Sequence, residues 1–420
     1  MTTVPPARPA TRRRRGRVLV IVLVAVVLIA AAGGGVRWWL TRPQGSPQAV
    51  EFAPAQLSPA MTGATVLALG EASHGNAEFQ RLRFAVIQKL PGFRAVLLEE
   101  DYGSTARVNE FVQGGPGTPE EAAHRFGFAL NHTAETAELL RRLREHNAGL
   151  PAAERIQLVG IDVQRIDANK QLALDWLSRH DRATADRFRS RLAGWTDATR
   201  GGADAAERDR DARPVVQELR TAVAGTPDAV GHRTAANAVT TLIQYLGLNE
   251  PGTAYGQRRA ELMADNLFRA VAEQRERGNR HSLLFAHNGH VDKASTAFPF
   301  RDLGGLAAER LGDGYRVIGT ELVHGRINTG SGNQRWEVTL DNPTPLRGMF
   351  TGTEQGYLEF ATASAENREL LGRPVRMASA GERFEQWQAW IPWFNSVEMV
   401  PTASYDALIL VGRATPTTPL

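Results

Sequence analysis

The segment TVLALGEASHGNAEFQRLRF (Thr65–Phe84) decides the fold, because it holds a short apolar run, a polar turn and the start of an amphipathic helix. The apolar run is typical of a buried strand in a parallel sheet. Gly70 and Gly75 allow sharp backbone turns on either side of the polar residues, and Asn76 is a suitable N-cap for the helix. This strand–turn–helix order predicts a layered α/β fold.

Similar apolar runs recur along the chain and alternate with helical stretches. They are RAVLLEE (94–100), IQLVGID (156–162), SLLFAHN (282–288), YRVIGTEL (315–322) and YDALILVG (405–412). The alternation predicts an α/β fold with a layered, mostly parallel sheet flanked by helices. Residues of about 167–277 lack a strand signal and predict a large helical insertion. The stretch RINTGSGNQRWEVTL (326–340) predicts a hairpin that makes the sheet mixed or adds an edge to it.

The N-terminal region predicts a membrane anchor. Residues 18–36 carry no charge, and a helix of that length spans roughly 28 Å at about 1.5 Å per residue, close to the thickness of a bilayer. The arginines before this run should stay cytoplasmic, while Trp38 and Trp39 suit the opposite interface. We therefore expect a single-pass protein of the cell membrane with an extracytoplasmic domain. A protein secreted after signal cleavage is the alternative.

These patterns divide the chain into four parts. They are a basic cytoplasmic segment (1–17), a transmembrane anchor (18–40), a Pro-rich linker (41–60) and an α/β domain (61–415). The formal net charge of +4 does not indicate a nucleic-acid partner, because eight arginines lie around the apolar run and the rest of the chain is negative without them. The absence of cysteine excludes a thiol nucleophile, a thiolate metal site and a disulfide framework.

Titratable residues follow the ends of five predicted strands. They are Glu71 and His74 after the first, Glu99, Glu100 and Asp101 after the second, Asp162 after the third, His287 and His290 after the fourth, and Glu321 after the fifth. The carboxyl ends of parallel strands form the ligand crevice of an open α/β sheet. We therefore expect these residues to share one polar site.

The helix after the polar turn places a charge on its apolar side. Its apolar stripe is formed by Phe79, Leu82, Val86 and Leu90. Arg83 lies within about 40° of the centre of this stripe at 100° per residue. A buried guanidinium requires a carboxylate partner, and we expect Glu71 or Glu99 to supply it. A histidine beside a carboxylate can accept a proton from water, which points to His74 as a general base for hydrolysis.

The later histidines, His287 and His290 in AHNGHV (286–291), are spaced so that both rings can face one side of a helical turn. They can donate to a developing oxyanion, bind a metal together with His74 and a carboxylate, or cap the next helix. The sequence contains no HExxH motif. It also contains no G-x-S-x-G elbow that would make Ser73 a nucleophile.

Five segments together resemble the erythromycin esterase family in order and spacing. They are GEASHGNAEFQRLR (70–83), LLEED (97–101), YGQRRAELMADN (255–266), AHNGHV (286–291) and YDALILVGRATPT (405–417). The combination of G-E-x-x-H-G, an arginine nine residues after its histidine and a downstream H-N-G-H is specific. The resemblance covers most of residues 60–415. It implies a hydrolase that opens macrolide lactones with water, on an α/β core with helical additions.

The resemblance also implies roles for individual residues. His74 corresponds to the water-activating base, and Ser73 stands where a threonine is common in the family. The residues expected to act in catalysis are His74, Glu71, Arg83, Glu99, His287 and His290. Those expected to contact substrate, from the strand ends and the match in the arginine-containing helix, are Asp162, Arg259 and Glu321.

These observations predict a membrane-anchored hydrolase that cleaves a small-molecule ester or lactone with a His-activated water, without a cofactor. The anchor departs from the family, because an enzyme that inactivates an antibiotic typically works in the cytosol. The substrate is then an envelope component or a secreted metabolite as readily as a macrolide. Two alternatives stay open: a metal-dependent hydrolase of the wider superfamily, and a ligand-binding surface protein without turnover.

Overall fold

The computed structural model describes residues 35, 38, 41–53, 56–90, 92–225, 231–249, 254–331, 334–350, 352 and 354–420. The predicted transmembrane anchor, residues 18–40, lies outside these ranges except for Gly35 and Trp38. Among the helices that are described, none has the length and apolar character needed to cross a bilayer.

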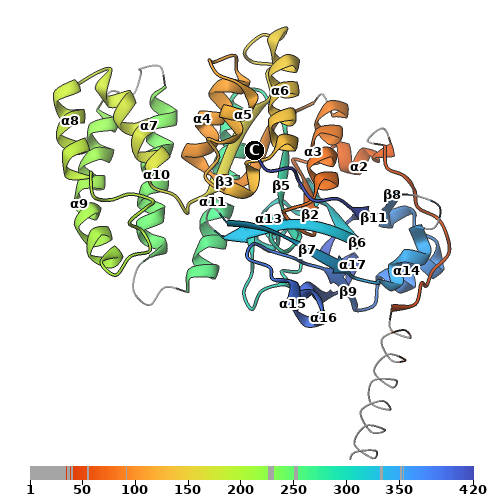
Figure 1. Cartoon of the computed structure of the whole chain (residues 1–420). Coiled ribbons are helices and arrows are strands. Elements are labelled where there is room, and N and C mark those ends of the chain that lie inside the picture. The colour runs from red at the N-terminus through yellow and green to blue at the C-terminus, as the bar shows by residue number, and fades with distance from the viewer. Residues whose placement is uncertain are drawn as a thin grey trace, which may run out of the picture.

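A nine-stranded sheet with the order β1-β8-β11-β6-β2-β5-β3-β4, and β7 beside β6, forms the centre of the described chain (Figure 1). Its parallel strands are β2 (Val66–Glu71), β3 (Phe93–Asp101), β4 (Gln157–Asp162), β5 (His281–His287), β6 (Tyr315–Ser331) and β11 (Ala407–Ala414). The antiparallel strands are β1 (Val50–Glu51), β7 (Gln334–Asp341) and β8 (Gln355–Glu359). The predicted mostly parallel sheet is confirmed, and the predicted hairpin is the β6–β7 pair.

Helices cover both faces of the sheet because alternate strand residues point to opposite sides. Val96 and Leu98 of β3 join the apolar cluster of α3 (Ala77–Lys89), α4 (Tyr102–Val112) and α6 (Ala134–Ala148). Ala95 and Leu97 of the same strand join the cluster of α11 (Tyr255–Glu276) and α13 (Leu303–Leu311) on the other face. The sheet is therefore buried on both sides, as its continuous apolar strands require.

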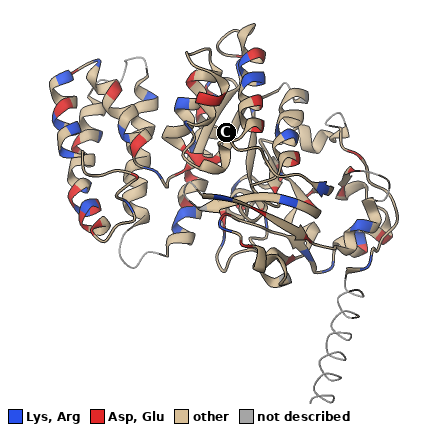
Figure 2. Ribbon diagram, in the orientation of Figure 1, with Lys and Arg blue, Asp and Glu red and all other residues tan. Residues whose placement is uncertain are grey.

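The residues expected to form a helical insertion contain α7 (Asp167–Ser178), α8 (Arg182–Arg191), α9 (Ala205–Ala224), α10 (His232–Leu248) and α11. Helices α7 to α10 lie beside α4 at the left of Figure 1. They have an apolar core of their own, which includes Trp176, Leu219 and Leu242. Basic and acidic residues are interspersed along these helices (Figure 2), and Arg191 of α8 pairs with Glu218 of α9.

The remaining elements are short. They are α2 (Pro59–Thr62), α5 (Pro119–Ala123), η2 (Ala129–Asn131), α12 (Asn288–Val291), η3 (Gly312–Gly314), η4 (Pro345–Phe350), η5 (Phe360–Thr362), α14 (Ala365–Leu371), β9 (Val375–Ala378), α15 (Gln386–Ala389), α16 (Pro392–Asn395), β10 (Ser396–Met399) and α17 (Pro401–Ser404). Strands β9 and β10 pair with each other in a separate two-stranded sheet.

The segment expected to be a free linker, residues 41–60, differs from that expectation where it is described, because it is packed on the domain. The backbone N–H of Gln44 donates to Pro345 O, and that of Gln48 donates to Met349 O. Strand β1 then extends the main sheet by pairing with β8. Proline and glycine show only that a segment lacks a repeating pattern, and its backbone groups can still find partners on a neighbouring surface.

Candidate active site

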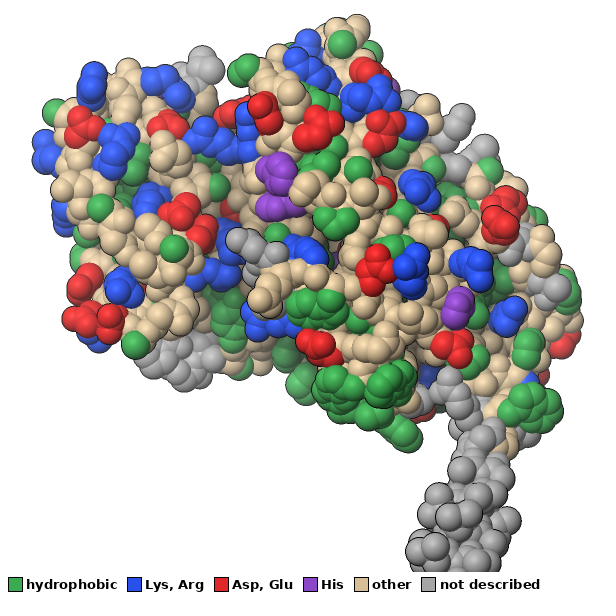
Figure 3. Space-filling view, viewed as in Figure 1, with side chains coloured by type: hydrophobic (Ala, Val, Ile, Leu, Met, Phe, Trp, Pro, Cys, Tyr) green, Lys and Arg blue, Asp and Glu red, His purple; other side chains and the backbone are tan. Residues whose placement is uncertain are grey.

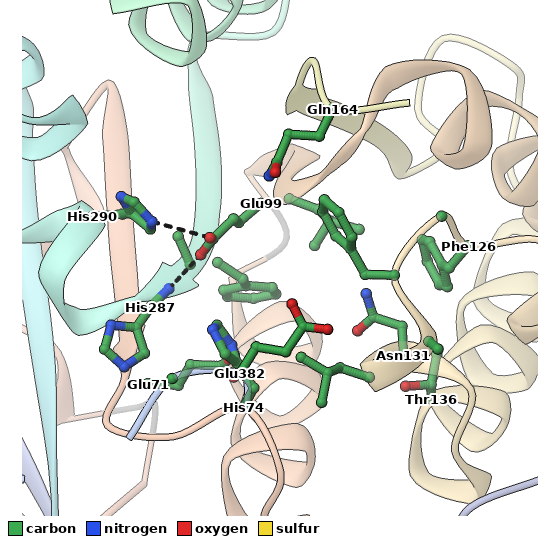
Figure 4. Close-up of a pocket in the computed structure, with 18 of the residues that line it drawn as sticks. Glu71, His74, Glu99, Phe126, Asn131, Thr136, Gln164, His287, His290 and Glu382 are labelled. Carbon is green, nitrogen blue, oxygen red and sulfur yellow. Dashed lines mark hydrogen bonds and ion pairs between the residues drawn. The ribbon is translucent and has the colours of Figure 1, made fainter. Parts of the chain in front are cut away.

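A cavity of about 860 Å³ opens at the carboxyl ends of the central strands (Figure 4). The structure brings all six residues expected to act in catalysis to its wall, together with Arg259. They are Glu71, His74, Arg83, Glu99, His287 and His290. Elements far apart in the sequence therefore contribute to one site, as the position of the strand ends predicts.

The turn after β2 holds its shape through close backbone packing. Neither Gly70 nor Gly75 has a positive φ, so the expected role of glycine flexibility is not what the turn requires. A Cβ at position 75 would lie 1.5 Å from the carbonyl oxygen of Asn328, and the N–H of Asn328 donates to Gly75 O. Asn76 caps α3 as expected, because its side chain accepts from the N–H of Phe79.

Glu71 links His74 to Arg83. The Nδ1 of His74 lies 2.6 Å from Glu71 Oε1, and the Nη2 of Arg83 lies 2.6 Å from Glu71 Oε2. Burial raises the pKa of Glu71, but the guanidinium of Arg83 and the hydrogen bond from His74 outweigh it and lower that pKa. Burial lowers the pKa of His74, but the hydrogen bond and charge of Glu71 raise it above 6.5. Glu71 thus holds Nδ1–H, and the lone pair of His74 is on Nε2.

A second network surrounds Glu99. Its Oε1 lies 2.9 Å from Nη2 of Arg259 and 3.1 Å from Nε2 of His290, and its Oε2 accepts from the backbone N–H of His287 (Figure 4). The Nδ1 of His290 lies 2.6 Å from Asp302 Oδ2. Burial lowers the pKa of His290, but the two carboxylates outweigh burial and raise it to about 10. His290 is therefore a cation with both N–H groups engaged.

His287 has the opposite electrostatic state. Burial and the neighbouring His74 lower the pKa of His287 to about 3, so its ring is neutral at physiological pH. Its Nδ1 accepts a hydrogen bond from the N–H of Gly289, which places the proton on Nε2. That Nε2 is buried and has no hydrogen-bond partner among the described residues. The His287 and His74 ring centroids are 5.0 Å apart, so a donor ring and an acceptor ring are neighbours on the cavity wall.

Comparison with known proteins adds to this geometry. A model of the erythromycin esterase family matches residues 89–414, which is more than half of the chain. The chain belongs to the erythromycin esterase family. The matched range includes Glu99, Arg259, His287 and His290, whereas the turn that holds His74 precedes it.

Solved structures of three proteins have a similar fold. A succinoglycan biosynthesis protein has a TM-score of 0.71 and 16% identity, over 89% of this chain and 95% of its own. A Bacillus cereus protein has a TM-score of 0.70 and 17% identity, over 92% and 99%. The erythromycin esterase EreC, as a histidine-to-asparagine mutant in an open conformation, has a TM-score of 0.60 and 20% identity, over 85% and 93%. At these identities the likeness concerns the fold alone.

Two residues expected to contact substrate do not line the cavity. Asp162 is fully buried, and it accepts hydrogen bonds from Arg259 and from the amide of Gln164. Glu321 is also fully buried and accepts from Asn342 Nδ2 and from two backbone N–H groups, and burial raises its pKa to about 8. The placement corrects both expectations: Asp162 holds Arg259 in position, and Glu321 is an internal hydrogen-bond acceptor.

Glu100 and Asp101, the other titratable residues at the end of β3, also face inward. Glu100 accepts from the N–H groups of Gly127 and Phe128, while Asp101 caps α4 at Ser104. Burial raises the pKa of Glu100 to about 8 and that of Asp101 to about 7. These carboxyl groups position the loop and helix beside the cavity rather than lining it.

Several residues of the site were not predicted. Asp302 precedes α13 like an N-cap, but its side chain makes no cap hydrogen bond and contacts His290 instead. Gln80 accepts a hydrogen bond from Nη1 of Arg83. Gln80 lies one helical turn before Arg83, and this spacing in the sequence could have predicted the contact. Other residues of the cavity wall come from loops without a repeating pattern, or, for Tyr255, from the first residue of α11. They include Phe126, Phe128, Gln164, Arg165, Arg200, Tyr255, Phe298, Glu382 and Arg383.

The metal alternative can be compared with the donor groups present. Within the ranges that the structure describes, no group of three or more His, Asp and Glu side chains is arranged to hold a metal ion. Both ring nitrogens of His290 already contact carboxylates. The three histidines thus occupy different hydrogen-bonding states and do not converge as a ligand set.

Proposed function

We propose that the protein hydrolyses an ester or lactone by attack of a His74-activated water on the acyl carbon. The observation that supports this most strongly is that the His74 acceptor and the His287 donor are on neighbouring rings in the wall of one cavity. Membership of the erythromycin esterase family supports an esterase-type hydrolase with a macrolide-like substrate.

In this proposal His74 Nε2 takes a proton from water as the water oxygen bonds to the acyl carbon. Glu71 accepts Nδ1–H and stabilises the imidazolium that forms. The carbonyl oxygen becomes an oxyanion and accepts a hydrogen bond from Nε2–H of His287. The carbon–oxygen bond to the leaving group then breaks, and the imidazolium returns the proton to the departing alkoxide.

The three candidate oxyanion donors differ in what they already contact. Arg83 is held by Glu71 and Gln80, and His290 is held by Glu99 and Asp302. His287 has a buried N–H that meets no acceptor in the described part of the chain. An uncommitted donor is ready for charge that develops only in the transition state, so His287 is the donor in this proposal.

His287→Ala is expected to lower kcat by about 10²–10³ with a smaller change in KM, because the lost hydrogen bond forms mainly in the transition state. His287→Gln should recover part of the activity, since an amide N–H can reach a similar position. Steady-state kinetics on one ester substrate measures both effects. Equal losses in the two variants would contradict a donor role.

The pH dependence of kcat/KM is expected to follow His74. A general base must be neutral, so activity should fall as the pH decreases through the His74 pKa, which Glu71 raises above 6.5. Glu71→Gln removes the negative charge and should move the midpoint of this acidic limb to lower pH. A pH–rate profile of the two proteins measures the shift. A midpoint that stays in place would show that the limb belongs to another group.

The reaction itself is tested with full-length protein in detergent and a panel of lactones and esters, by searching for products that gain the mass of one water. Hydrolysis by the wild-type protein but not by His74→Ala supports the proposal. Binding without turnover across the panel would favour a ligand-binding surface protein. Loss of activity on chelation, with recovery on adding stoichiometric metal, would favour the metal-dependent alternative.

We also propose that residues 18–40 anchor the protein in the cell membrane with the catalytic domain outside. The uncharged run 18–36 after the arginine cluster supports this orientation. Protease protection in spheroplasts tests it, because an external domain is cleaved without permeabilisation. Recovery of the domain in the medium would instead support secretion after cleavage.

A further inference from the structure

The cavity continues from the catalytic histidines toward the helical insertion. Its wall there is formed by Gln164 and Arg165 after β4, Arg200 between α8 and α9, and Tyr255 at the start of α11. The phenol of Tyr255 donates to Gln164 Oε1, and Nη1 of Arg200 donates to the backbone carbonyl of Gln164. These contacts join three separate segments around one end of the cavity.

This end of the cavity has more positive than negative charge. Arg83 and Arg259 on the cavity wall are paired with Glu71 and with Glu99 and Asp162. Arg165 and Arg200 also line the cavity, but neither forms an ion pair with any residue in the described ranges. Both guanidinium groups are close enough to Tyr255 to oppose the rise in its phenol pKa that burial and Asp162 cause.

The carboxylates near Arg165 and Arg200 already accept hydrogen bonds from other groups. Asp162 accepts from Arg259, Gln164 and the N–H of Val163. Asp197 accepts from the backbone at the start of α7. Arg165 stacks over Phe128, with 5.2 Å from Cζ to the ring centroid, and its buried Nε has no partner in the described structure. A partly desolvated guanidinium with unused donors favours a carboxylate, phosphate or sulfate as its partner.

We propose that Arg165 and Arg200 form a subsite for an anionic group of the substrate. This inference rests on the proposed hydrolysis and narrows its substrate class to esters or lactones that carry a carboxylate, phosphate or sulfate away from the acyl carbon. A substrate with a cationic group at that end is disfavoured, because it would meet two positive charges.

The test compares 4-nitrophenyl monoesters of dicarboxylic acids, from glutaric to sebacic acid, with the 4-nitrophenyl esters of alkanoic acids of equal length. The Arg165→Gln/Arg200→Gln double variant removes both charges. The Arg182→Gln/Arg187→Gln double variant is the matched control, because it makes the same charge change on the exposed surface of α8. Equilibrium binding of the free dicarboxylates, measured by calorimetry, gives a readout that does not require turnover.

For the best chain length, wild type and control are expected to prefer the anionic ester by about tenfold or more in kcat/KM, and the cavity variant should lose the preference. The neutral esters should react equally with all three proteins. If no ester is hydrolysed but dicarboxylate binding still depends on Arg165 and Arg200, the subsite stands and the proposed hydrolysis fails. Equal rates for both ester series in wild type, or a preference that survives in the cavity variant, would overturn the subsite.

A different observation supports a second inference, which does not depend on the reaction. Five large apolar side chains are exposed on α15, α16 and the two residues between these helices, and we call them the aromatic surface. They are Trp387 (49% exposed), Trp390 (74%), Ile391 (38%), Trp393 (76%) and Phe394 (50%). A hydrophobic area is visible at the lower edge of Figure 3, where Figure 1 places these helices. An apolar patch of this kind marks an interaction site.

The position of this surface relates it to the N-terminal segment. Residues 44–49 pack on η4 and α14, and the apolar cluster that includes Ala49, Leu370, Val375 and Val397 continues through α14 to β9 and β10. The aromatic surface lies between these two strands in the chain. The uncharged run 18–36 ends eight residues before Gln44. Eight residues of extended chain reach at most roughly 28 Å, at about 3.5 Å per residue.

We infer that the aromatic surface inserts into the interfacial layer of a bilayer, and this inference rests on the proposed anchoring of the chain by residues 18–40. Tryptophan favours this layer, because its ring is apolar and its N–H can reach water or headgroups. The Arg376 Cζ lies 5.5 Å from the ring centroid of Trp393, which places a cation beside the expected phosphate level. The segment that carries the surface also contributes Gly381, Glu382 and Arg383 to the cavity wall, so docking would fix the cavity relative to the membrane.

The chain contains no cysteine, so a single label site can be introduced without other changes. Full-length Trp390→Cys, labelled with an environment-sensitive fluorophore and placed in lipid nanodiscs, is compared with Arg182→Cys on α8, whose native side chain is 88% exposed. Position 390 is expected to show blue-shifted emission that lipids brominated near the headgroups quench, and position 182 should show neither. Water-like emission at 390, or a blue shift without quenching by bromolipids, would overturn the inference. The second of these results would indicate a protein partner such as another copy of the chain.

Discussion

His74→Ala is expected to lower kcat for ester hydrolysis by about 10²–10⁴, the usual contribution of a general base. In the proposed reaction this ring receives the proton from water, and among the described residues Glu71 contacts no other neutral acceptor. The variant should fold normally, because Arg83 continues to neutralise Glu71 when the imidazole is removed. Single-turnover kinetics and thermal unfolding measure the two expectations separately.

His324→Ala is the matched control, since His324 is half exposed on β6 and is absent from the cavity wall. Its turnover should equal that of the wild type. Glu71→Gln added to His74→Ala should cost little further activity, because Glu71 acts through the imidazole. Turnover of His74→Ala near the wild-type level, with the same reaction product, would exclude His74 as the base.

The sequence was sufficient to predict the sheet and a carboxylate partner for Arg83, because both depend on local patterns. Apolar runs bounded by turns identify buried strands, and a charge within an apolar helical stripe must find a partner in the interior. Arg83 met this condition, and Glu71 is the partner that the structure shows. The sequence alone did not show whether Glu71 or Glu99 pairs with Arg83, because both strands end at the same edge of the sheet.

The position of a carboxylate at a strand end did not show whether its side chain reaches the cavity, since neighbouring residues of a strand point to opposite faces. The register of β2 and β6 places Leu69 beside Ile318, so Glu71 and Thr320 share a face and Glu321 turns to the other. In β3 the pairing shifts between Leu98 and Asp101. Alternation therefore could not tell which of its three terminal carboxylates reaches the cavity.

Cavity residues on irregular loops and at the start of α11 could not be assigned to the site from the sequence. Arg165, Arg200 and Tyr255 are brought together by the packing of the insertion, and no spacing relates them along the chain. The aromatic surface was missed for another reason. Its tryptophans stand among apolar residues in the sequence, and apolar composition alone does not distinguish a buried segment from an exposed one.

Arg259→Met is expected to lower the free energy of unfolding by about 3–5 kcal/mol, because it leaves buried carboxylates without their cation. Arg259 contacts Glu99 at 2.9 Å and Asp162 at 2.6 Å. Asp162 is fully buried beside the guanidinium, so its charge depends on this partner. Methionine keeps the apolar stem of arginine up to about the position of Nε, so the substitution removes mainly the guanidinium group. Urea unfolding at neutral pH measures it.

The adjacent residue supplies the control for this prediction. Arg258 is 43% exposed and pairs only with Glu261 on the helix surface among the residues described, so Arg258→Met should change stability by less than about 1 kcal/mol.

The pH dependence of the stability difference between wild type and Arg259→Met provides a further check. His290 and Arg259 outweigh burial and lower the pKa of Glu99 well below 4.5, so its stabilising contribution is present above 4.5 and is lost as the pH falls through the folded-state pKa. The difference between wild type and Arg259→Met should therefore be largest at neutral pH and shrink in acid. A difference that grows as the pH falls would show that Arg259 does not stabilise these carboxylates.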